Sequence, residues 1–207
     1  PPSPSPPLPT YSWRNFSPSP HFQYIRNIDH ANVAVAHIQR GPVGFDLEWK
    51  PTFHRDHPPN PVALVQLATH DTILLIQVSA MGVFPKMLKI LLENPEILKT
   101  GVGIQRDAQK LYRDWGVSMR GCVDLAVLAR TVDNARWKGL YSNSIGLARL
   151  VETYNGLVLG KHKRVVRSNW ERRLDLAQQE YAANDASAGF RMYLKFADMM
   201  KHMETTP

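Results

Sequence analysis

Two acidic residues, Asp46 and Glu48, lie two positions apart in the otherwise apolar stretch GFDLEWK at residues 44–50. The pattern predicts a β-strand, in which side chains at positions i and i+2 point to the same face. Asp46 and Glu48 are therefore expected on one face, with Phe45 and Leu47 packed into the core on the other. Two carboxylates this close repel each other, and desolvation increases the repulsion. A solvated outer face, a salt-bridge partner or a divalent cation would each relieve it.

A third acidic residue and a tyrosine–aspartate pair could take part in the same chemistry. Asp107 lies in GVGIQRDAQKL, where a strand is expected to pass into a helix, and its alternative role is to cap that helix. Tyr181 and Asp185 are four positions apart in EYAANDASAGF, so a helix would place them on one face. Their alternative is a core tyrosine bonded to an acid. The surrounding alanines would let such a helix lie close to a sheet.

The order of these residues, D-x-E on a strand, D at a strand-to-helix junction and Y-x-x-x-D on a late helix, resembles the DEDD superfamily of 3′–5′ exonucleases. The tyrosine matches one branch of that superfamily, and within the branch the chain is similar to the Werner-syndrome-type exonuclease domain. A histidine-type relative would carry His at position 180, which is Glu here. The stretches that carry the resemblance, within residues 22–198, are VGFDLEW, VALVQLAT, VFPKMLKILLEN, GVGIQRDAQKL, RSNW and YAANDASAGF.

The resemblance implies hydrolysis of phosphodiester bonds at a 3′ end by two Mg²⁺ or Mn²⁺ ions roughly 3.5–4 Å apart, with release of nucleoside monophosphates. All-carboxylate ligands suit these ions. Asp46 would bridge both ions, and Glu48 and Asp185 would hold the ion that activates water. Asp107 would help to hold the second ion. Tyr181 would orient the attacking water rather than take its proton, because the reference pKa of a phenol is about 10.

A basic segment, KHKRVVRSNWERR at residues 161–173, precedes the predicted catalytic helix. We interpret its first part as a strip that follows the phosphates of the substrate strand, with a solvated loop as the alternative. Trp170 within this segment is expected to anchor it in the core. The residues predicted to contact nucleic acid are Lys161, Lys163, Arg164, Arg167 and, through its backbone, Leu47.

Alternating strand and helix patterns predict the elements that must position these residues. Strands are expected at residues 22–27, 43–50, 62–69, 72–78 and 97–103. Helices are expected at residues 30–41 with Asp29 as the N-cap, 83–94, 106–116, 121–132, 143–156 and 175–201. This order predicts an α/β domain with a mixed β-sheet flanked by helices. The resemblance implies the RNase H-like version of that class.

The composition of the chain indicates the extent of the domain, the class of its partner and its cellular environment. Residues 1–20 are rich in Pro and Ser and predict a disordered tail or linker, which leaves one domain over residues 21–207. The net charge of +7 favours nucleic acid as the partner, with an anionic membrane as the second choice. A single cysteine, Cys122, indicates a reducing, intracellular setting. No stretch reaches the roughly 20 apolar residues of a membrane span.

These observations together predict a metal-dependent 3′–5′ exonuclease that favours DNA. Its expected setting is DNA repair in the nucleus, with a helicase as a possible partner. One alternative is an RNase D-like exoribonuclease of the same build. The other alternative is a nucleic-acid-binding module with weak or vestigial hydrolysis, which an Asp46→Ala substitution would distinguish from an enzyme.

Overall fold

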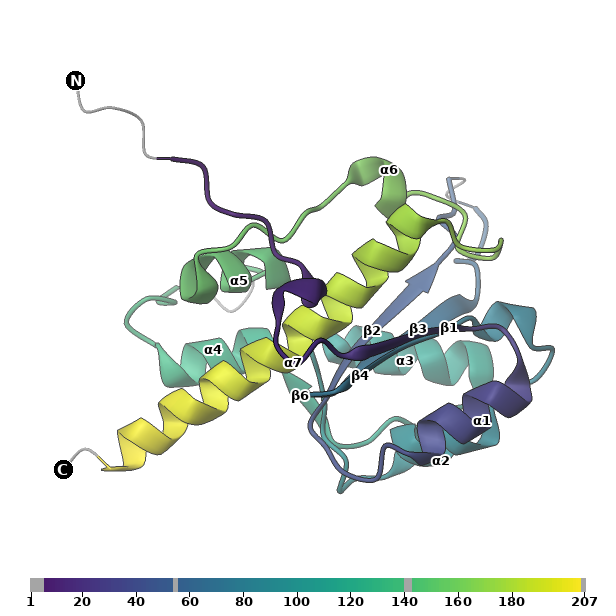
Figure 1. Cartoon of the computed structure of the whole chain (residues 1–207), viewed down its shortest axis with the longest axis horizontal. Coiled ribbons are helices and arrows are strands. Elements are labelled where there is room, and N and C mark those ends of the chain that lie inside the picture. Colours follow the sequence, from purple (N-terminus) through teal and green to yellow (C-terminus); the bar gives the residue numbers. More distant parts are fainter. Residues whose placement is uncertain (1–5, 54–55, 140–142, 206–207) are drawn as a thin grey trace.

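A six-stranded mixed sheet forms the centre of the molecule, in the order β1-β4-β3-β2-β5-β6 (Figure 1). The computed structural model describes residues 6–53, 56–139 and 143–205. The strands in these ranges are β1 (His21–Ile25), β2 (Val43–Trp49), β3 (Val62–Ala68), β4 (Thr72–Ile76), β5 (Lys99–Gly101) and β6 (Cys122–Asp124). β2 pairs antiparallel with β3 and parallel with β5, so the strand with the first two acids has neighbours on both sides. The predicted α/β class is confirmed.

Helices cover both faces of this sheet. They are α1 (Ile28–Ala36), α2 (Lys86–Glu93), α3 (Ile104–Trp115), α4 (Leu125–Val132), α5 (Leu147–Asn155), α6 (Lys163–Val166) and α7 (Leu176–Thr205), with short 3-10 turns η1 (Trp13–Asn15) and η2 (Val78–Ala80). The long α7 crosses one face of the sheet, and α4 and α5 lie beside its C-terminal part (Figure 1). None of the helices in the described ranges combines the length and apolar character that crossing a membrane requires.

The two faces of the sheet are distinguished by alternation along β3, whose seven residues are all buried. Val65 and Leu67 pack with Leu111 of α3 in the core cluster that also takes in α1 and α2. Leu64 points the other way and packs with Ala183 of α7. Because both faces are covered, β3 reads as a continuous apolar run rather than as an alternating one.

α7 approaches β2 closely because small residues meet at the crossing. A Cβ added at Gly44 would overlap the backbone oxygen of Ala186, so only glycine fits at that position. Ala182, Ala183 and Ala186 are fully buried against the sheet. The close approach expected from these alanines is confirmed, and it sets Tyr181 and Asp185 over the strand that carries the first two acids.

Several of the predicted element boundaries are wrong. The helix predicted over residues 30–41 begins at Ile28 and ends at Ala36. Asn27, rather than Asp29, caps α1: its Oδ1 accepts hydrogen bonds from two backbone N–H groups of the first turn. The helix predicted over residues 121–132 begins as β6, which pairs with β5, and becomes α4 only after Asp124. The apolar run is continuous across this change, so its periodicity does not reveal the short strand. Asp124 caps α4 by accepting from Ala126 N–H at 2.9 Å. The predicted basic loop contains the single-turn helix α6.

The N-terminal segment packs against the domain from residue 9 onward. Thr10 forms a parallel β-bridge with Val158, and Tyr11 N–H donates to Val158 O at 2.9 Å. The Tyr11 hydroxyl hydrogen-bonds Ser187 Oγ of α7 at 2.8 Å, and Trp13 is 5% exposed. These contacts tie the segment to both α7 and the chain that follows α5.

The prediction of a disordered tail over residues 1–20 is therefore wrong for residues 10–20. Residues 1–5 lie outside the described ranges, and residues 6–9 are exposed. Pro and Ser dominate the composition of the segment, but Tyr11, Trp13 and Phe16 supply enough apolar surface to hold it on the domain.

Candidate active site

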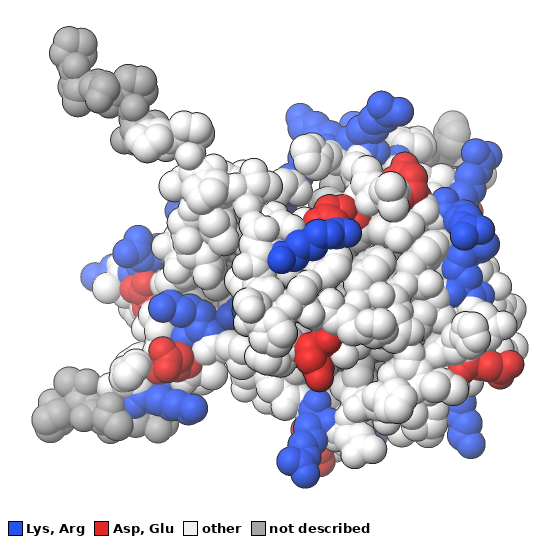
Figure 2. Space-filling model, viewed as in Figure 1, with Lys and Arg blue, Asp and Glu red and all other residues white. Residues whose placement is uncertain are grey.

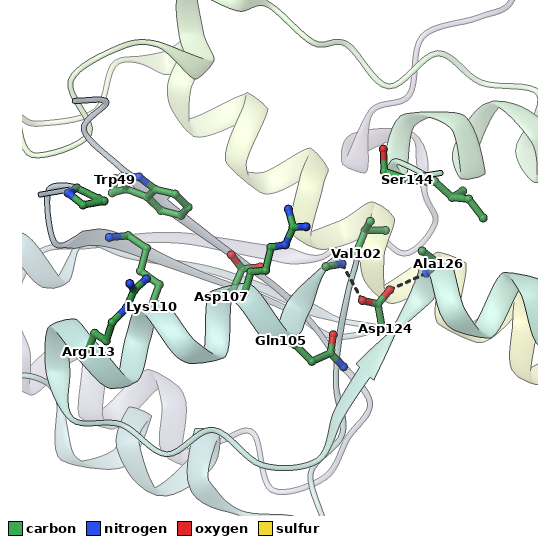
Figure 3. Close-up of a pocket in the computed structure, with 13 residues that line it drawn as sticks. Trp49, Val102, Gln105, Asp107, Lys110, Arg113, Asp124, Ala126 and Ser144 are labelled. Carbon is green, nitrogen blue, oxygen red and sulfur yellow. Dashed lines mark hydrogen bonds between the residues drawn. The ribbon is translucent and has the colours of Figure 1, made fainter. Parts of the chain in front are cut away.

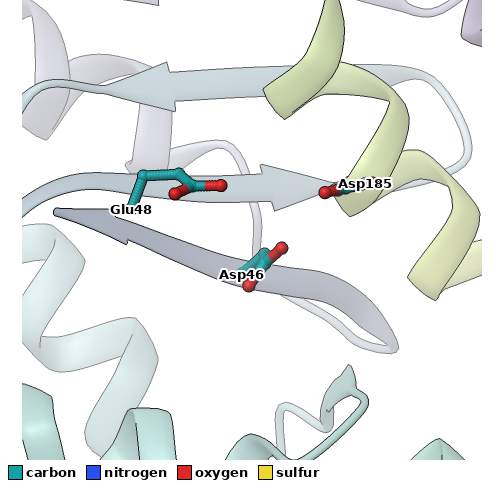
Figure 4. A group of neighbouring side chains, drawn as sticks. All are labelled: Asp46, Glu48 and Asp185. Atoms are coloured by element: carbon teal, nitrogen blue, oxygen red, sulfur yellow. The ribbon is translucent and has the colours of Figure 1, made fainter. Parts of the chain in front are cut away.

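Three carboxylates converge between the sheet and α7. Asp46 and Glu48 come from β2, and Asp185 comes from α7 (Figure 4). One oxygen from each of the three lies within 4.8 Å of the others. Phe45 and Leu47 point away into the core cluster on the opposite face. The structure thus confirms that Asp46 and Glu48 share a face, and it excludes a fully solvated one, because all three acids are at least half-buried.

Burial and mutual repulsion disfavour negative charge in this cluster. Burial raises the pKa of Asp46 to about 6, although a hydrogen bond from Leu47 N–H at 2.8 Å opposes the change. Burial, followed by the neighbouring Asp46, raises the pKa of Asp185 to about 8. Burial and the surrounding carboxylates also hold the pKa of Glu48 well above its usual value. A divalent cation would supply the positive charge that this arrangement lacks.

Asp107 lies in the first turn of α3, beside the three-carboxylate cluster. Burial and then the carboxylates of Asp46 and Asp124 raise the pKa of Asp107 to about 8. Asp124 secures the start of this helix, because its Oδ2 accepts from Gly103 N–H at 3.0 Å while its Oδ1 caps α4 (Figure 3). The side chain of Asp107 faces the groove described below rather than the helix end.

Tyr181 stands beside Asp185 on the same side of α7. Its hydroxyl hydrogen-bonds Asp185, and its ring packs 6.1 Å from the ring of Trp170. Burial, Asp185 and Glu48 all raise the pKa of Tyr181 far above its usual value. The phenol therefore keeps its proton and can donate a hydrogen bond at any working pH. Trp170 is fully buried, which confirms its expected role as an anchor in the core.

A small cavity of about 220 Å³ opens beside the carboxylates and is lined by Lys161. The ammonium of Lys161 lowers the pKa of both Asp46 and Asp185, against the larger effect of burial. Gly146, Leu147 and Leu159 line the far side of this cavity. Lys161 is thus the predicted basic residue that the structure brings nearest to the acids.

The remaining predicted contact residues lie further from the acids. Lys163 and Arg164 are exposed on α6, and Arg167 is exposed directly after it. Figure 2 shows basic side chains gathered over α6, above the start of α7. The side chain of Leu47 is 4% exposed and belongs to the core, so its backbone alone faces the site.

A groove of about 710 Å³ continues from Asp107 along α3 (Figure 3). Arg106 and Arg113 are exposed at its edge. The ammonium of Lys110 lies 4.7 Å from the ring centre of Trp49 and forms a 2.9 Å ion pair with Asp114. Sequence reasoning missed this groove. The available signal was the spacing of seven residues between the two arginines, which places them on one side of a helix.

Comparison with known proteins gives the family. Residues 22–201 match the model of the 3′–5′ exonuclease domain. The mouse bifunctional 3′–5′ exonuclease/ATP-dependent helicase WRN is 38% identical over 159 residues, which are 76% of this chain but 11% of the mouse protein. A 3′–5′ exonuclease of Arabidopsis thaliana is 34% identical over 160 residues, 76% of this chain and 53% of the plant protein.

Solved structures share the fold. The EXO domain of Aedes aegypti Nibbler superposes with a TM-score of 0.77 at 24% identity, and the match covers 94% of each chain. Escherichia coli RNase D superposes with a TM-score of 0.73 at 23% identity, over 90% of this chain and 47% of the bacterial one. The chain spans about half or less of the curated relatives named above. Residues 22–201, which match the family model, include every predicted acid and the tyrosine. The chain belongs to the 3′–5′ exonuclease domain family.

Proposed function

We propose that this domain is a 3′–5′ exonuclease that removes nucleotides from the 3′ end of nucleic acid, DNA in preference, with two Mg²⁺ or Mn²⁺ ions. The observation that carries the proposal is the convergence of three half-buried carboxylates, from β2 and α7, within 4.8 Å of one another. Such a cluster is stable in ionised form only with cations, and its all-oxygen donor set suits hard divalent ions.

The four acids and the tyrosine would have different roles in this reaction. Asp46 would bridge two ions, with Glu48 and Asp185 on the first and Asp107 on the second. When bound, the ions supply an activated water and neutralise charge on the leaving oxygen. The protonated Tyr181 donates a hydrogen bond that orients the attacking water. The raised pKa of Tyr181 supports this positioning role over proton abstraction near neutral pH.

Two basic surfaces support a path for the substrate strand. Lys161 lines the cavity beside the acids and would contact the phosphate that is cleaved. Lys163, Arg164 and Arg167 would follow the phosphates further along the strand. The groove beside α3 is open next to Asp107, and we propose that it receives the terminal nucleotides, with the backbone of Leu47 near the last one.

RNA is the second candidate substrate, and one observation favours it. A Shewanella ribonuclease D is 29% identical to this chain over 182 residues, 87% of this chain and 44% of the bacterial protein. The remaining alternative, a module that binds without cutting, would leave the four half-buried acids without a use.

We also propose nuclear DNA repair as the setting and a helicase as the partner. The support is the mouse relative, whose name joins an exonuclease and an ATP-dependent helicase in one protein. Co-purification of a DNA helicase with the tagged full-length protein from nuclear extract would test this setting. Recovery with RNA-processing factors alone would contradict it.

The experiment that tests the activity is a cleavage ladder on 5′-labelled DNA and RNA oligonucleotides, single-stranded or with recessed 3′ ends. We expect a ladder that shortens from the 3′ end in Mg²⁺ or Mn²⁺ and disappears in EDTA. Asp46→Ala should abolish it while leaving binding intact, and Glu96→Gln, an exposed acid remote from the site, should not change it. Cleavage that survives Asp46→Ala would show that the site is wrong.

A further inference from the structure

Gln66 occupies the middle of β3 and is fully buried. Its partner across the antiparallel β2–β3 pair is Asp46. Residues that lie directly opposite each other on neighbouring strands point to the same face, with Cβ atoms about 4.5–5.5 Å apart. The side chain of Gln66 therefore projects with that of Asp46 into the layer between the sheet and α7.

The amide of Gln66 has no hydrogen-bond partner. Among the described residues, four buried side-chain nitrogen or oxygen atoms lack a partner, and two of these are Nε2 and Oε1 of Gln66. An unsatisfied buried amide lowers stability, whereas an apolar side chain of the same size would not. The metal-free fold therefore gains nothing from an amide at this position.

Gln77 is the matched comparison, because it is also fully buried. Its Oε1 accepts from the Tyr24 hydroxyl and from Arg26 Nε. Its Nε2 donates to the backbone oxygens of Trp170 and Arg172, at 2.9 and 2.6 Å. The amide of Gln77 therefore has hydrogen-bond partners at both its oxygen and its nitrogen, whereas the amide of Gln66 has none.

We propose that Gln66 is a positioning residue of the metal centre, and this rests on the function proposed above. When the ions hold the cluster ionised, its Nε2 would donate to a carboxylate oxygen of Asp46 or Asp185 and so fix the orientation of that ligand. Ionised carboxylates accept hydrogen bonds and do not donate them, so they are suitable partners for the N–H groups of an amide. Because Gln66 is sealed from solvent, its partners must come from the site itself.

The orientation that Gln66 gives to these ligands should strengthen ion binding. Groups that hydrogen-bond metal ligands typically change metal affinity about 10–100-fold when they are removed. Gln66 is fully buried, so it does not touch the substrate and is not itself a catalytic residue. Its loss should act on the ions, and on cleavage only through them.

The test compares Gln66→Met with Gln77→Met, since methionine has a similar volume and no amide. Two quantities are measured without nucleic acid: the Tm in EDTA and the Kd for Mn²⁺ by titration calorimetry. For Gln66→Met we expect an unchanged or higher Tm in EDTA and a Kd for Mn²⁺ raised about 10–100-fold. For Gln77→Met we expect the reverse, a Tm lower by about 2–10 °C and an unchanged Kd.

A second measurement uses the wild-type protein and does not depend on any variant folding. With ¹⁵N-labelled glutamine, the side-chain N–H resonances of Gln66 should move when Mg²⁺ is added, while those of Gln77 should stay in place. Resonances of Gln66 that ignore Mg²⁺ would overturn the inference. So would a Gln66→Met variant that binds Mn²⁺ as wild type does, or one that loses as much Tm in EDTA as Gln77→Met.

Failure of this inference can be told apart from failure of the proposed function. If the wild-type protein binds no Mn²⁺, both are overturned. If Asp46→Asn abolishes Mn²⁺ binding and Gln66→Met leaves it unchanged, the metal site stands and only the role of Gln66 is wrong.

Discussion

Removing divalent ions should make the stability of this protein fall as pH rises from 5 to 7. The reason is the carboxylate cluster. In the unfolded chain these groups lose their protons near pH 4. In the folded chain Asp107 and Asp185 keep theirs until about pH 8, because burial and neighbouring acids raise their pKa. Unfolding therefore releases protons between these values, so the free energy of unfolding decreases with pH.

The magnitude follows from the number of protons held only by the folded chain. Each one contributes about 1.4 kcal/mol per pH unit. One proton kept from pH 5 to 7 gives a loss of about 3 kcal/mol, and two give about 5 kcal/mol, against a typical total of about 5–15 kcal/mol. Asp46, with a pKa of about 6, and Glu48, with a pKa well above its usual value, act in the same direction and add to this loss. The lowered pKa values of Asp71 and Glu93 affect stability below this window, and Lys99, with a pKa lowered to about 8, affects it above the window.

The assay is urea unfolding in EDTA at pH 5, 6 and 7, at constant ionic strength. Asp185→Asn should reduce the slope by about 1.4 kcal/mol per pH unit, because it removes one of the retained protons. Glu96→Gln should keep the wild-type slope, since that residue is exposed. Saturating Mg²⁺ should stabilise the protein more at pH 7 than at pH 5, because the ions need ionised ligands. A metal-free stability that is flat or rises between pH 5 and 7 would refute the reasoning.

Three further variants test other parts of the domain. Tyr181→Phe should lower kcat about 10–100-fold without changing the shape of the pH–rate profile, and a lost pKa in that profile would show that the phenol takes a proton. Lys163→Ala combined with Arg164→Ala should reduce the slope of log Kd against log salt concentration by about 1.4 for single strands, and an unchanged slope would contradict the phosphate strip. Trp13→Ala should lower the free energy of unfolding by about 3–5 kcal/mol in urea titration, whereas a loss under 1 kcal/mol would mean that the N-terminal segment does not pack on the domain.

The sequence predicted those features that depend on local periodicity. Alternation along β2 puts Asp46 and Glu48 on one face, and the spacing of four residues on α7 keeps Tyr181 beside Asp185. Both follow from the geometry of a single element, and the structure confirms both. The order of strands in the sheet, the short strand β6 and the groove beside α3 depend on which elements become neighbours. No pattern within one element specifies those contacts.

The pairing of β2 with β3 gives an example of a site feature that no pattern within one element could predict. Gln66 lies 20 positions after Asp46, inside an apolar run that reads as an ordinary buried strand. Only the register of the antiparallel pair sets it opposite the acid. A one-residue shift in that register would turn the amide to the other face, among Val65 and Leu67. The same packing of α7 against Gly44 that buries this layer also raises the pKa values of the acids. The contacts that close the core therefore place the acids where their ionised forms require bound cations. The same few residues thus determine both the stability and the metal binding of this domain.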